Sequence, residues 1–89
     1  MIIEKVLSFD EFQGFLSDTL GLAAVALHRD ASFLGDLGVD SLKLVEVILQ
    51  FELQLGIAVP TGAAWEIQTV GDAYDYYVGQ VRGDGASGE

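Results

Sequence analysis

The 89-residue sequence contains no cysteine and a single histidine, His28. The absence of cysteine excludes disulfides, thiolate metal sites and a cysteine nucleophile. A serine nucleophile needs a base within hydrogen-bond reach and usually a third group that orients that base. No G-x-S-x-G turn surrounds Ser41, and His28 is expected to be a surface residue of a loop. The sequence therefore does not predict an enzyme.

Basic residues are also scarce. Lys5, Arg29, Lys43 and Arg82 oppose fourteen aspartates and glutamates, and the formal net charge is −10. A phosphate backbone or an anionic membrane surface would repel this chain, so nucleic acid and membranes are not expected partners. A basic patch on another protein is the natural complement, because opposite charge speeds the encounter. The alternative is that the acidity only aids solubility.

Long apolar runs are missing as well. No stretch approaches the ~20 apolar residues that span a bilayer, and the N-terminus lacks the apolar core of a signal peptide. A cytoplasmic protein is therefore expected. Apolar residues still make up 51% of the chain, which is enough for one compact core. We expect a single small domain over residues 1–82, followed by a disordered tail over residues 83–89.

The apolar residues that are present recur at helical spacing. Four helices are predicted, over residues 8–20 and 41–55, as one or two turns within residues 61–67, and from residue 69 onward. Ser8 and Glu11 fit a capping box at the first helix start, Gly21 ends that helix, and Thr69 caps the last helix. Residues 21–40 form a long loop whose large apolar side chains should pack onto the core. The predicted fold is a small all-α four-helix bundle with a long loop between helices 1 and 2 and a short helix 3.

The helix predicted over residues 41–55 carries two apolar stripes. The stripe at core spacing consists of Leu44, Val47, Ile48, Phe51 and Leu55. The second stripe consists of Leu42, Val45 and Leu49, close to Ser41 and on a different side of the helix. One stripe is enough for a surface helix, so the second indicates either burial on two sides or a face that binds a partner.

Residues 30–41 can be aligned with a calcium-binding EF-hand loop. Asp30 then takes the first ligand position and Gly35 the invariant glycine. Leu34 fails as a ligand at the fifth position, and Ser41 fails at the twelfth, where a bidentate glutamate is required. No calcium site or other metal site is predicted, and Gly35 is expected to serve a turn.

Ser41 follows Asp40 at the start of the second predicted helix, and two interpretations are open. In the first, Asp40 is the N-cap and Ser41 is an ordinary residue of the first turn. In the second, Ser41 is a site that another enzyme modifies. A first-turn side chain points outward near unpaired backbone N–H groups, where the helix dipole favours an anion. A phosphate ester on Ser41 would suit this position.

The segment ASFLGDLGVDSLKLVEV, residues 31–47, resembles the acyl carrier protein family. It contains the family's pattern of a phenylalanine in the loop, then D-L-G, then D-S-L at the start of the second helix. GIAVP followed by TVGDAYDYY resembles the family's later landmarks at the expected spacing. D-S-L alone is a weak signal, but the resemblance extends from about Leu7 to Val81.

The resemblance implies that Ser41 receives a 4′-phosphopantetheine arm from coenzyme A, donated by a separate phosphopantetheinyl transferase. The thiol of the arm then carries acyl groups as thioesters, which explains a carrier without cysteine. The resemblance also implies that Asp40 caps the helix and helps to hold the Mg²⁺ of the transferase. The chain itself is expected to have no catalysis and to be a monomer.

Further positions are implied by the same resemblance. Partner contacts are expected at Leu42, Val45, Glu46, Leu49 and Glu52, and Trp65 is a further candidate that we expect to be at least partly exposed. An acyl-chain pocket is expected from Phe33, Leu34, Phe51, Val59, Ala64, Ile67, Ala73 and Tyr76, each of which has ordinary core packing as its alternative. The implied partners are the transferase and an acyl- or aminoacyl-loading enzyme, an acyltransferase or a ketosynthase with a basic docking patch.

Three residues depart from the pattern of fatty-acid carriers. Lys43 and Leu53 stand where that pattern often has acidic residues, and Trp65 lies in a segment that is usually acidic. The partner face is therefore less acidic and more apolar, which favours a discrete carrier in specialised, polyketide-type biosynthesis. The alternatives are an aminoacyl or peptidyl carrier of a nonribosomal pathway and a helical adaptor that is never modified.

Overall fold

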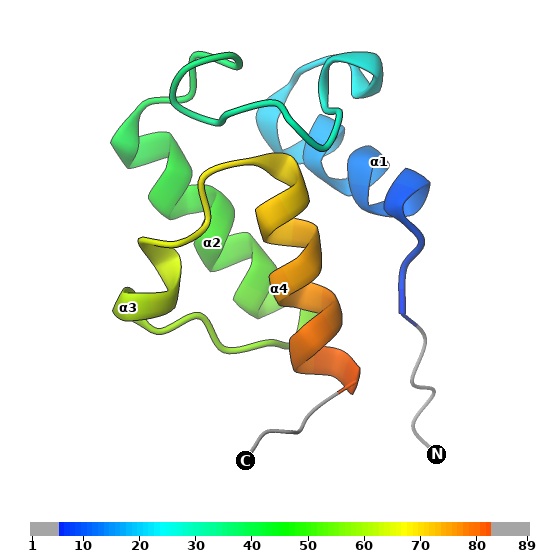
Figure 1. The fold of residues 1–89 in the computed structure, drawn as a ribbon, viewed down its shortest axis with the longest axis vertical. Coiled ribbons are helices and arrows are strands. Elements are labelled where there is room, and N and C mark those ends of the chain that lie inside the picture. The colour runs from blue at the N-terminus through cyan, green and yellow to red at the C-terminus, as the bar shows by residue number, and fades with distance from the viewer. Residues whose placement is uncertain (1–5, 83–89) are drawn as a thin grey trace.

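The computed structural model describes residues 6–82 as helices joined by loops (Figure 1). The helices are α1 (Phe9–Leu20), the 3-10 turn η1 (Ala24–Ala26), α2 (Ser41–Leu55), α3 (Thr61–Ala64) and α4 (Val70–Arg82). Among the described residues the structure holds no strand, only an isolated bridge between Ser32 and Thr69. The predicted four-helix, all-α fold is confirmed. The tail predicted over residues 83–89 lies outside the described part of the chain.

Local capping fixes where α1 begins and ends. The Glu11 backbone N–H donates to Ser8 Oγ at 3.1 Å, and the Ser8 N–H donates to Glu11 Oε1 at 2.8 Å. This reciprocal pair is the predicted capping box. Gly21 ends the helix in the left-handed conformation, with φ of 71°, which glycine adopts without a steric penalty.

The last helix is capped in a similar way. The Asp72 backbone N–H donates to Thr69 Oγ1 at 3.0 Å, and Asp72 Oδ2 accepts the Thr69 N–H at 3.2 Å. Without these two side-chain acceptors, the N–H groups at the start of α4 would have no partner within the helix. The predicted cap at Thr69 is confirmed.

The third helix is one turn long, within the one or two turns predicted for residues 61–67. It ends at Ala64 because the chain tightens there, with the Glu66 N–H bonded to the Ala63 carbonyl at 3.0 Å and the Ile67 N–H to the Ala64 carbonyl at 3.2 Å. These three-residue spacings belong to a 3-10 turn. The turn directs Ile67 into the core, where its exposed fraction is 4%.

An aromatic cluster holds the three long helices together. The buried Phe12 ring of α1 lies with its centroid 5.7 Å from Phe51 of α2, 5.3 Å from Tyr74 and 5.8 Å from Tyr77 of α4. Such pairs add about 0.5–1.5 kcal/mol each beyond the burial of their area. Phe51 is therefore fixed among rings rather than facing a surface hollow.

The long loop packs onto the helices, as its apolar content predicts. Leu27, Ala31, Phe33 and Val39 are buried. The expectation is wrong for Val25, which is 86% exposed on η1, and for Leu34, which is 56% exposed. Backbone hydrogen bonds from Val70 to the Ala31 carbonyl and from Gly71 to the Arg29 carbonyl, 3.0 and 2.9 Å long, fasten the loop to the start of α4.

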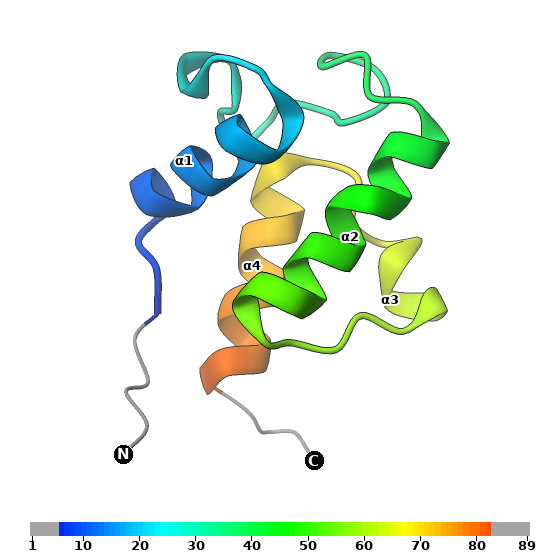
Figure 2. The same ribbon diagram turned by 180° about the vertical axis from the view of Figure 1, so that it is seen from behind.

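The helices are arranged with α1 and α3 on opposite sides of the α2–α4 pair (Figures 1 and 2). The first described residues and the C-terminal end of α4 both lie toward the lower end of the molecule in Figure 1, whereas α2 begins near its upper end. The described part of the chain contains no helix long and apolar enough to cross a membrane.

Candidate functional site

Ser41 is the first residue of α2 and is exposed. Asp40 is the N-cap, since its Oδ1 accepts the Lys43 backbone N–H at 2.8 Å. The predicted cap is therefore confirmed, and it places the Ser41 hydroxyl at the positive end of the helix dipole. An anionic ester there would meet backbone N–H groups that have no partner within the helix.

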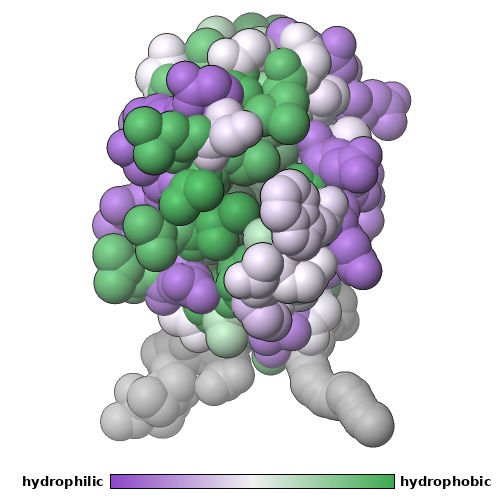
Figure 3. Space-filling model, turned by 90° about the vertical axis from the view of Figure 1, so that its left-hand side faces the viewer, coloured by the Kyte–Doolittle hydropathy of each residue, from purple (hydrophilic) through white to green (hydrophobic). Residues whose placement is uncertain are grey.

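A groove of about 530 Å³ begins at Ser41 and runs between α2 and the α3 segment. We call it the α2–α3 groove. Its apolar lining consists of Phe33, Leu34, Leu44, Val45, Ile48, Leu49, Val59, Ala64, Trp65 and Ile67. Its polar lining is Ser32, Ser41, Glu52, Thr61 and Gln68. Figure 3 shows apolar side chains gathered around a hollow on this side of the molecule. The serine and an apolar channel are thus parts of one surface feature.

Five of the eight residues predicted for an acyl pocket line this groove, namely Phe33, Leu34, Val59, Ala64 and Ile67. Phe51, Ala73 and Tyr76 do not. Phe51 and Ala73 are each 1% exposed within the core, and the Tyr76 hydroxyl donates to the Ala58 carbonyl. Core packing therefore holds for Phe51 and Ala73, whereas Tyr76 is only half-buried.

Sequence reasoning missed Leu44 and Ile48 as groove residues. Both belong to the stripe at core spacing, and both are half-buried because they lie at its edge, next to the groove. Their position at the edge of the core stripe, on the side of Ser41, could have indicated that they line a groove.

A continuous apolar row follows the exposed side of α2. It consists of Leu42, Val45, Leu49 and Leu53, which are 71%, 53%, 50% and 77% exposed. We call this set the α2 apolar row. The first three are predicted partner contacts, and the structure places them on the surface. Leu53 extends the row by one turn and was not predicted as a contact.

A second hollow, of about 590 Å³, flanks this row on the side of α1. We call it the α1–α2 hollow, and it is lined by Phe15, Asp18, Thr19, Lys43, Glu46, Leu49, Gln50, Leu53 and Gln54. Leu49 lines both hollows, so the row forms the ridge between them.

The two glutamates predicted as partner contacts have bonds within the molecule. Glu46 Oε1 lies 3.4 Å from Lys43 Nζ on the next turn. Glu52 is half-buried, and its Oε2 accepts the Val59 N–H at 3.0 Å. Glu52 thereby braces the segment before α3, and its contact with a partner stays a prediction.

Tyr76 braces the same segment from α4. Its hydroxyl donates to the Ala58 carbonyl, one residue before Val59. Partial burial raises the pKa of the Tyr76 phenol above its usual value of 10.0, and the nearby Glu52 carboxylate adds to the rise. The neutral phenol, which can donate, is the form that this environment favours.

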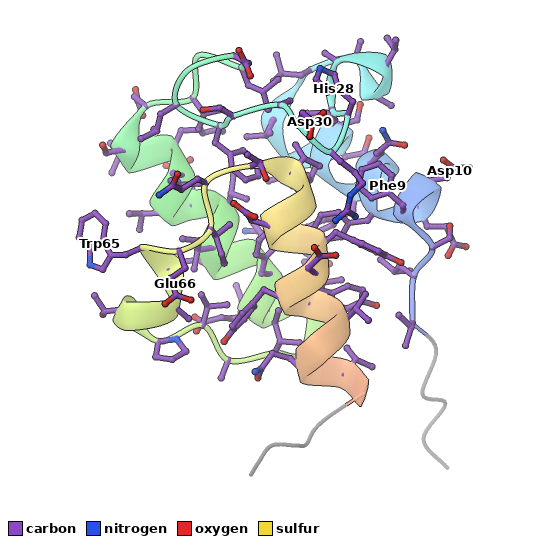
Figure 4. The ribbon with its side chains drawn as sticks, viewed as in Figure 1. Phe9, Asp10, His28, Asp30, Trp65 and Glu66 are labelled. Atoms are coloured by element: carbon purple, nitrogen blue, oxygen red, sulfur yellow. The ribbon has the colours of Figure 1, made fainter. Side chains whose placement is uncertain are left out.

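Trp65 follows α3 and is 77% exposed, so the predicted exposure is confirmed. Figure 4 shows the indole projecting away from the body of the molecule. Trp65 also lines the α2–α3 groove. A large apolar side chain left in water beside a groove is a feature of binding surfaces rather than of cores.

The loop before α2 contains the turn that was expected at Gly35. Asp36 Oδ2 accepts the Ser32 N–H at 2.9 Å, and the Gly35 N–H donates to Ser32 Oγ at 2.9 Å, which makes the expected turn. His28 is exposed and lies on the side of the molecule next to α1, away from the start of α2 (Figure 4). Within residues 6–82 no group of three or more possible metal ligands comes together.

Comparison with known proteins identifies the family of the chain. The family model described as the phosphopantetheine attachment site matches residues 10–77. Acyl carrier proteins from two strains of Porphyromonas gingivalis are each 48% identical over 59 residues, covering 66% of this chain and 76% of theirs. The chain belongs to the acyl carrier protein family. Members of this family are carriers without catalysis, and they interact with enzymes that modify them or handle acyl groups.

As an acyl carrier protein, the chain is a site of covalent 4′-phosphopantetheine attachment. The residues present fit this group. An exposed hydroxyl at a helix N-terminus suits the phosphate, and an apolar groove that starts at that hydroxyl suits an uncharged arm and acyl chain.

Proposed function

We propose that Ser41 is the residue that carries the 4′-phosphopantetheine arm. The supporting observation is that the other serines of residues 6–82 use their hydroxyls in local structure. Ser8 Oγ caps α1, Ser17 Oγ donates to the Leu22 carbonyl at 2.5 Å, and Ser32 Oγ accepts the Gly35 N–H. Ser41, by contrast, is exposed and lines the α2–α3 groove.

In this proposal a separate phosphopantetheinyl transferase moves the arm from coenzyme A to Ser41. Ser41 Oγ gives its proton to the transferase and attacks the pantetheine-side phosphorus of coenzyme A; the P–O–P bond breaks, a phosphodiester forms at Ser41 and adenosine 3′,5′-bisphosphate leaves. The arm supplies the thiol that holds acyl groups as thioesters, and this chain supplies only the attachment and the surface. Asp40 keeps the hydroxyl at the helix start and offers its second carboxylate oxygen to the transferase's Mg²⁺. Phe33, Leu34, Val59, Ala64 and Ile67 would contact the apolar part of the cargo.

The proposed partners are the transferase and an acyl- or aminoacyl-loading enzyme, an acyltransferase or a ketosynthase. The carrier is proposed to act as a monomer, and its proposed contacts are Leu42, Val45, Glu46, Leu49 and Glu52, with Trp65 as an additional one. At long range the net charge of −10 favours partners with basic surfaces, because attraction raises the encounter rate.

The proposed setting is specialised, polyketide-type biosynthesis. It is supported by Lys43 and the exposed Leu53, which make the partner face less acidic than expected for a fatty-acid carrier, and by Trp65 beside the groove. An aminoacyl or peptidyl carrier is the second candidate, since an apolar face beside the serine serves both kinds.

Incubation with coenzyme A and a broad-specificity phosphopantetheinyl transferase tests the proposal. Intact-mass spectrometry should show one added arm on the wild-type chain and none on Ser41→Ala, while Ser32→Ala serves as the matched control and should be modified. An arm on Ser8, Ser17, Ser32 or Ser87 would refute the assignment, and no arm at all would favour the unmodified adaptor. Assays of the modified carrier with candidate ligases and adenylating enzymes would then separate acyl from aminoacyl cargo.

A further inference from the structure

We infer that the α2–α3 groove selects its cargo by charge, and that it suits an acyl group with an apolar body and a cationic amine. The inference rests on the proposed function, because the arm at Ser41 would carry this cargo, and it names the class of the cargo. Glu52 is the residue that makes the selection. The charge of the groove, the positions of the cations and an exposed indole support this assignment.

Glu52 is the one ionisable side chain that lines the groove, whose other lining residues are apolar or neutral. It follows Ser41 by eleven residues of α2, which places it about 16 Å further along the helix axis. The carboxylate is half-buried, and its Oε2 accepts the Val59 N–H at 3.0 Å, which fixes its position. Beside apolar surface a charge acts more strongly on its neighbours than it does in water. The groove therefore holds a fixed negative charge away from the attachment site.

The cations whose side chains the structure describes do not neutralise Glu52. They are Arg29 and Lys43. Arg29 is paired with Asp75 at 2.7 Å, and Lys43 Nζ lies 3.4 Å from the Glu46 carboxylate. Lys43 and Glu46 line the α1–α2 hollow instead of the groove. The charge of Glu52 is thus left to act on whatever enters the groove.

Three kinds of cargo would meet this charge differently. An acyl group that ends in a carboxylate would bring a second negative charge beside Glu52, and the net charge of −10 would add to the repulsion. An uncharged chain would reduce the contact of Glu52 with water without giving it a partner, which costs free energy. An ammonium group replaces the lost water with an ion pair and a charge-assisted hydrogen bond.

Trp65 provides a second feature that favours a cation. Its indole is 77% exposed and lines the same groove. The face of an indole attracts ammonium groups more strongly than the other aromatic side chains do. The carboxylate of Glu52 and the indole of Trp65 therefore both favour an amine, while the apolar lining suits the hydrocarbon part of the cargo.

The test loads the carrier with cargoes of matched length, namely hexanoyl, ω-aminohexanoyl and adipoyl, each joined to the arm by an amide that does not hydrolyse. Coenzyme A analogues and the broad-specificity transferase attach them, and intact-mass spectrometry verifies the loading. Thermal unfolding then compares the wild type with Glu52→Gln, whose amide oxygen can still accept the Val59 N–H. Glu46→Gln is the matched control, because it removes one charge from the same helix outside the groove.

We expect the melting temperature of the wild type to be highest with ω-aminohexanoyl, lower with hexanoyl and lowest with adipoyl. The difference between the amine and the carboxylate cargo should be roughly 4 °C in the wild type and in Glu46→Gln, and less than about 1 °C in Glu52→Gln. An undiminished difference in Glu52→Gln would overturn the inference. An equal reduction in Glu46→Gln would also overturn it, since net charge would then be the cause, and so would a wild type that hexanoyl stabilises most.

Circular dichroism verifies that the variants fold, and amide NMR of the wild type gives a second measurement that needs no variant. The Val59 N–H bonds to the Glu52 carboxylate, so its signal should shift on loading with ω-aminohexanoyl more than on loading with adipoyl. An unchanged Val59 signal with the amine cargo would contradict the inference. A wild-type chain that takes no arm would refute the proposed function itself, and mass spectrometry reports that separately.

Discussion

Asp40 stands where one carboxylate can serve both folding and modification. One of its oxygens accepts the Lys43 N–H at 2.8 Å and so fixes the first turn of α2. The residue that follows it is the proposed attachment site. Substitutions that keep the hydrogen bond but remove the charge can therefore separate the two roles.

Asp40→Ala should lower the free energy of unfolding by about 1 kcal/mol through loss of the N-cap, whereas Asp40→Asn should stay within a few tenths of a kcal/mol because asparagine caps equally well. Urea denaturation measures both. The asparagine variant should nevertheless accept the arm more slowly, since it lacks the charge for the transferase's Mg²⁺. Attachment at the wild-type rate would show that only capping matters.

Trp65→Ala should lower the free energy of unfolding by less than about 1.5 kcal/mol, because the indole is 77% exposed. A tryptophan in the core would cost roughly 3–5 kcal/mol on truncation. Acyl transfer to or from the modified carrier should be slowed, since Trp65 lines the groove that begins at Ser41. A large loss in the urea melt with normal transfer would mean that Trp65 is structural.

Single residues also show what the sequence can and cannot predict. The caps at Ser8, Asp40 and Thr69 were predictable because each bond joins residues three positions apart. The rings that Phe51 meets and the brace made by Glu52 were not, since both depend on which segments pack against α2. Periodicity predicts on which face of its helix a residue lies, but not which neighbour that residue contacts.

At the scale of the helices, α4 contains two glycines in opposite situations. A Cβ added at Gly71 would lie 3.0 Å from the Arg29 carbonyl oxygen and 3.2 Å from Arg29 Cβ, whereas one added at Gly79 would meet nothing within 4 Å. Gly71 lets the long loop approach the start of α4 closely. Gly79 has no such neighbour.

Gly71→Ala should therefore destabilise the fold by about 1–3 kcal/mol through overpacking. Gly79→Ala should stabilise it by about 0.5–1 kcal/mol, because alanine loses less backbone freedom in a helix. The two urea melts form a matched pair on one helix. If both substitutions changed the free energy of unfolding in the same direction, the close contact between the loop and α4 would be contradicted.

The α2–α3 connection depends on α4 through Tyr76. Tyr76→Phe should cost about 1 kcal/mol of unfolding free energy by removing the hydrogen bond to the Ala58 carbonyl, and amide exchange should quicken around Ala58. The pKa of Tyr76 is raised in the folded state, so its contribution is complete below the unfolded value of about 10 and is lost as the pH rises through the folded value. The wild type should lose this stability at alkaline pH, and the phenylalanine variant should not. Parallel alkaline melts of the two proteins would argue against the bond.

Helix boundaries could be predicted closely where caps are local. For residues 61–67 the sequence left one or two helical turns open, and the structure has one, which stops at Ala64. The reason is tertiary, since Ile67 has to enter the core and the Phe33 N–H bonds to the Gln68 carbonyl at 3.0 Å. Such long-range hydrogen bonds cannot be predicted from the periodicity of the sequence.

For the whole molecule, the net charge of −10 is spread over a body only 35 × 26 × 21 Å in extent. The Debye length is about 30 Å at 0.01 M salt and about 10 Å at 0.1 M. At low salt the carboxylates therefore repel one another across the entire fold, which opposes the compact state.

Raising NaCl from 0.01 to 0.5 M should increase the melting temperature by roughly 5 °C, the change expected for about 1 kcal/mol in a chain of this size. The same series near the isoelectric pH of 4.1 is the control, because the net charge is then close to zero and the increase should largely vanish. An unchanged melting temperature at neutral pH would show that the carboxylates are too far apart to matter.

The positions of residues 6 and 82, which bound the described part of the chain, have a practical consequence for handling the molecule. The first described residues and the end of α4 lie toward one end of the long axis, and α2 begins toward the other (Figure 1). A fluorophore, a fusion partner or a sensor chip can therefore be coupled beyond either of these residues. Ser41 is then directed away from the coupled group. Immobilised in this orientation, the carrier could be loaded and unloaded by enzymes supplied in free solution.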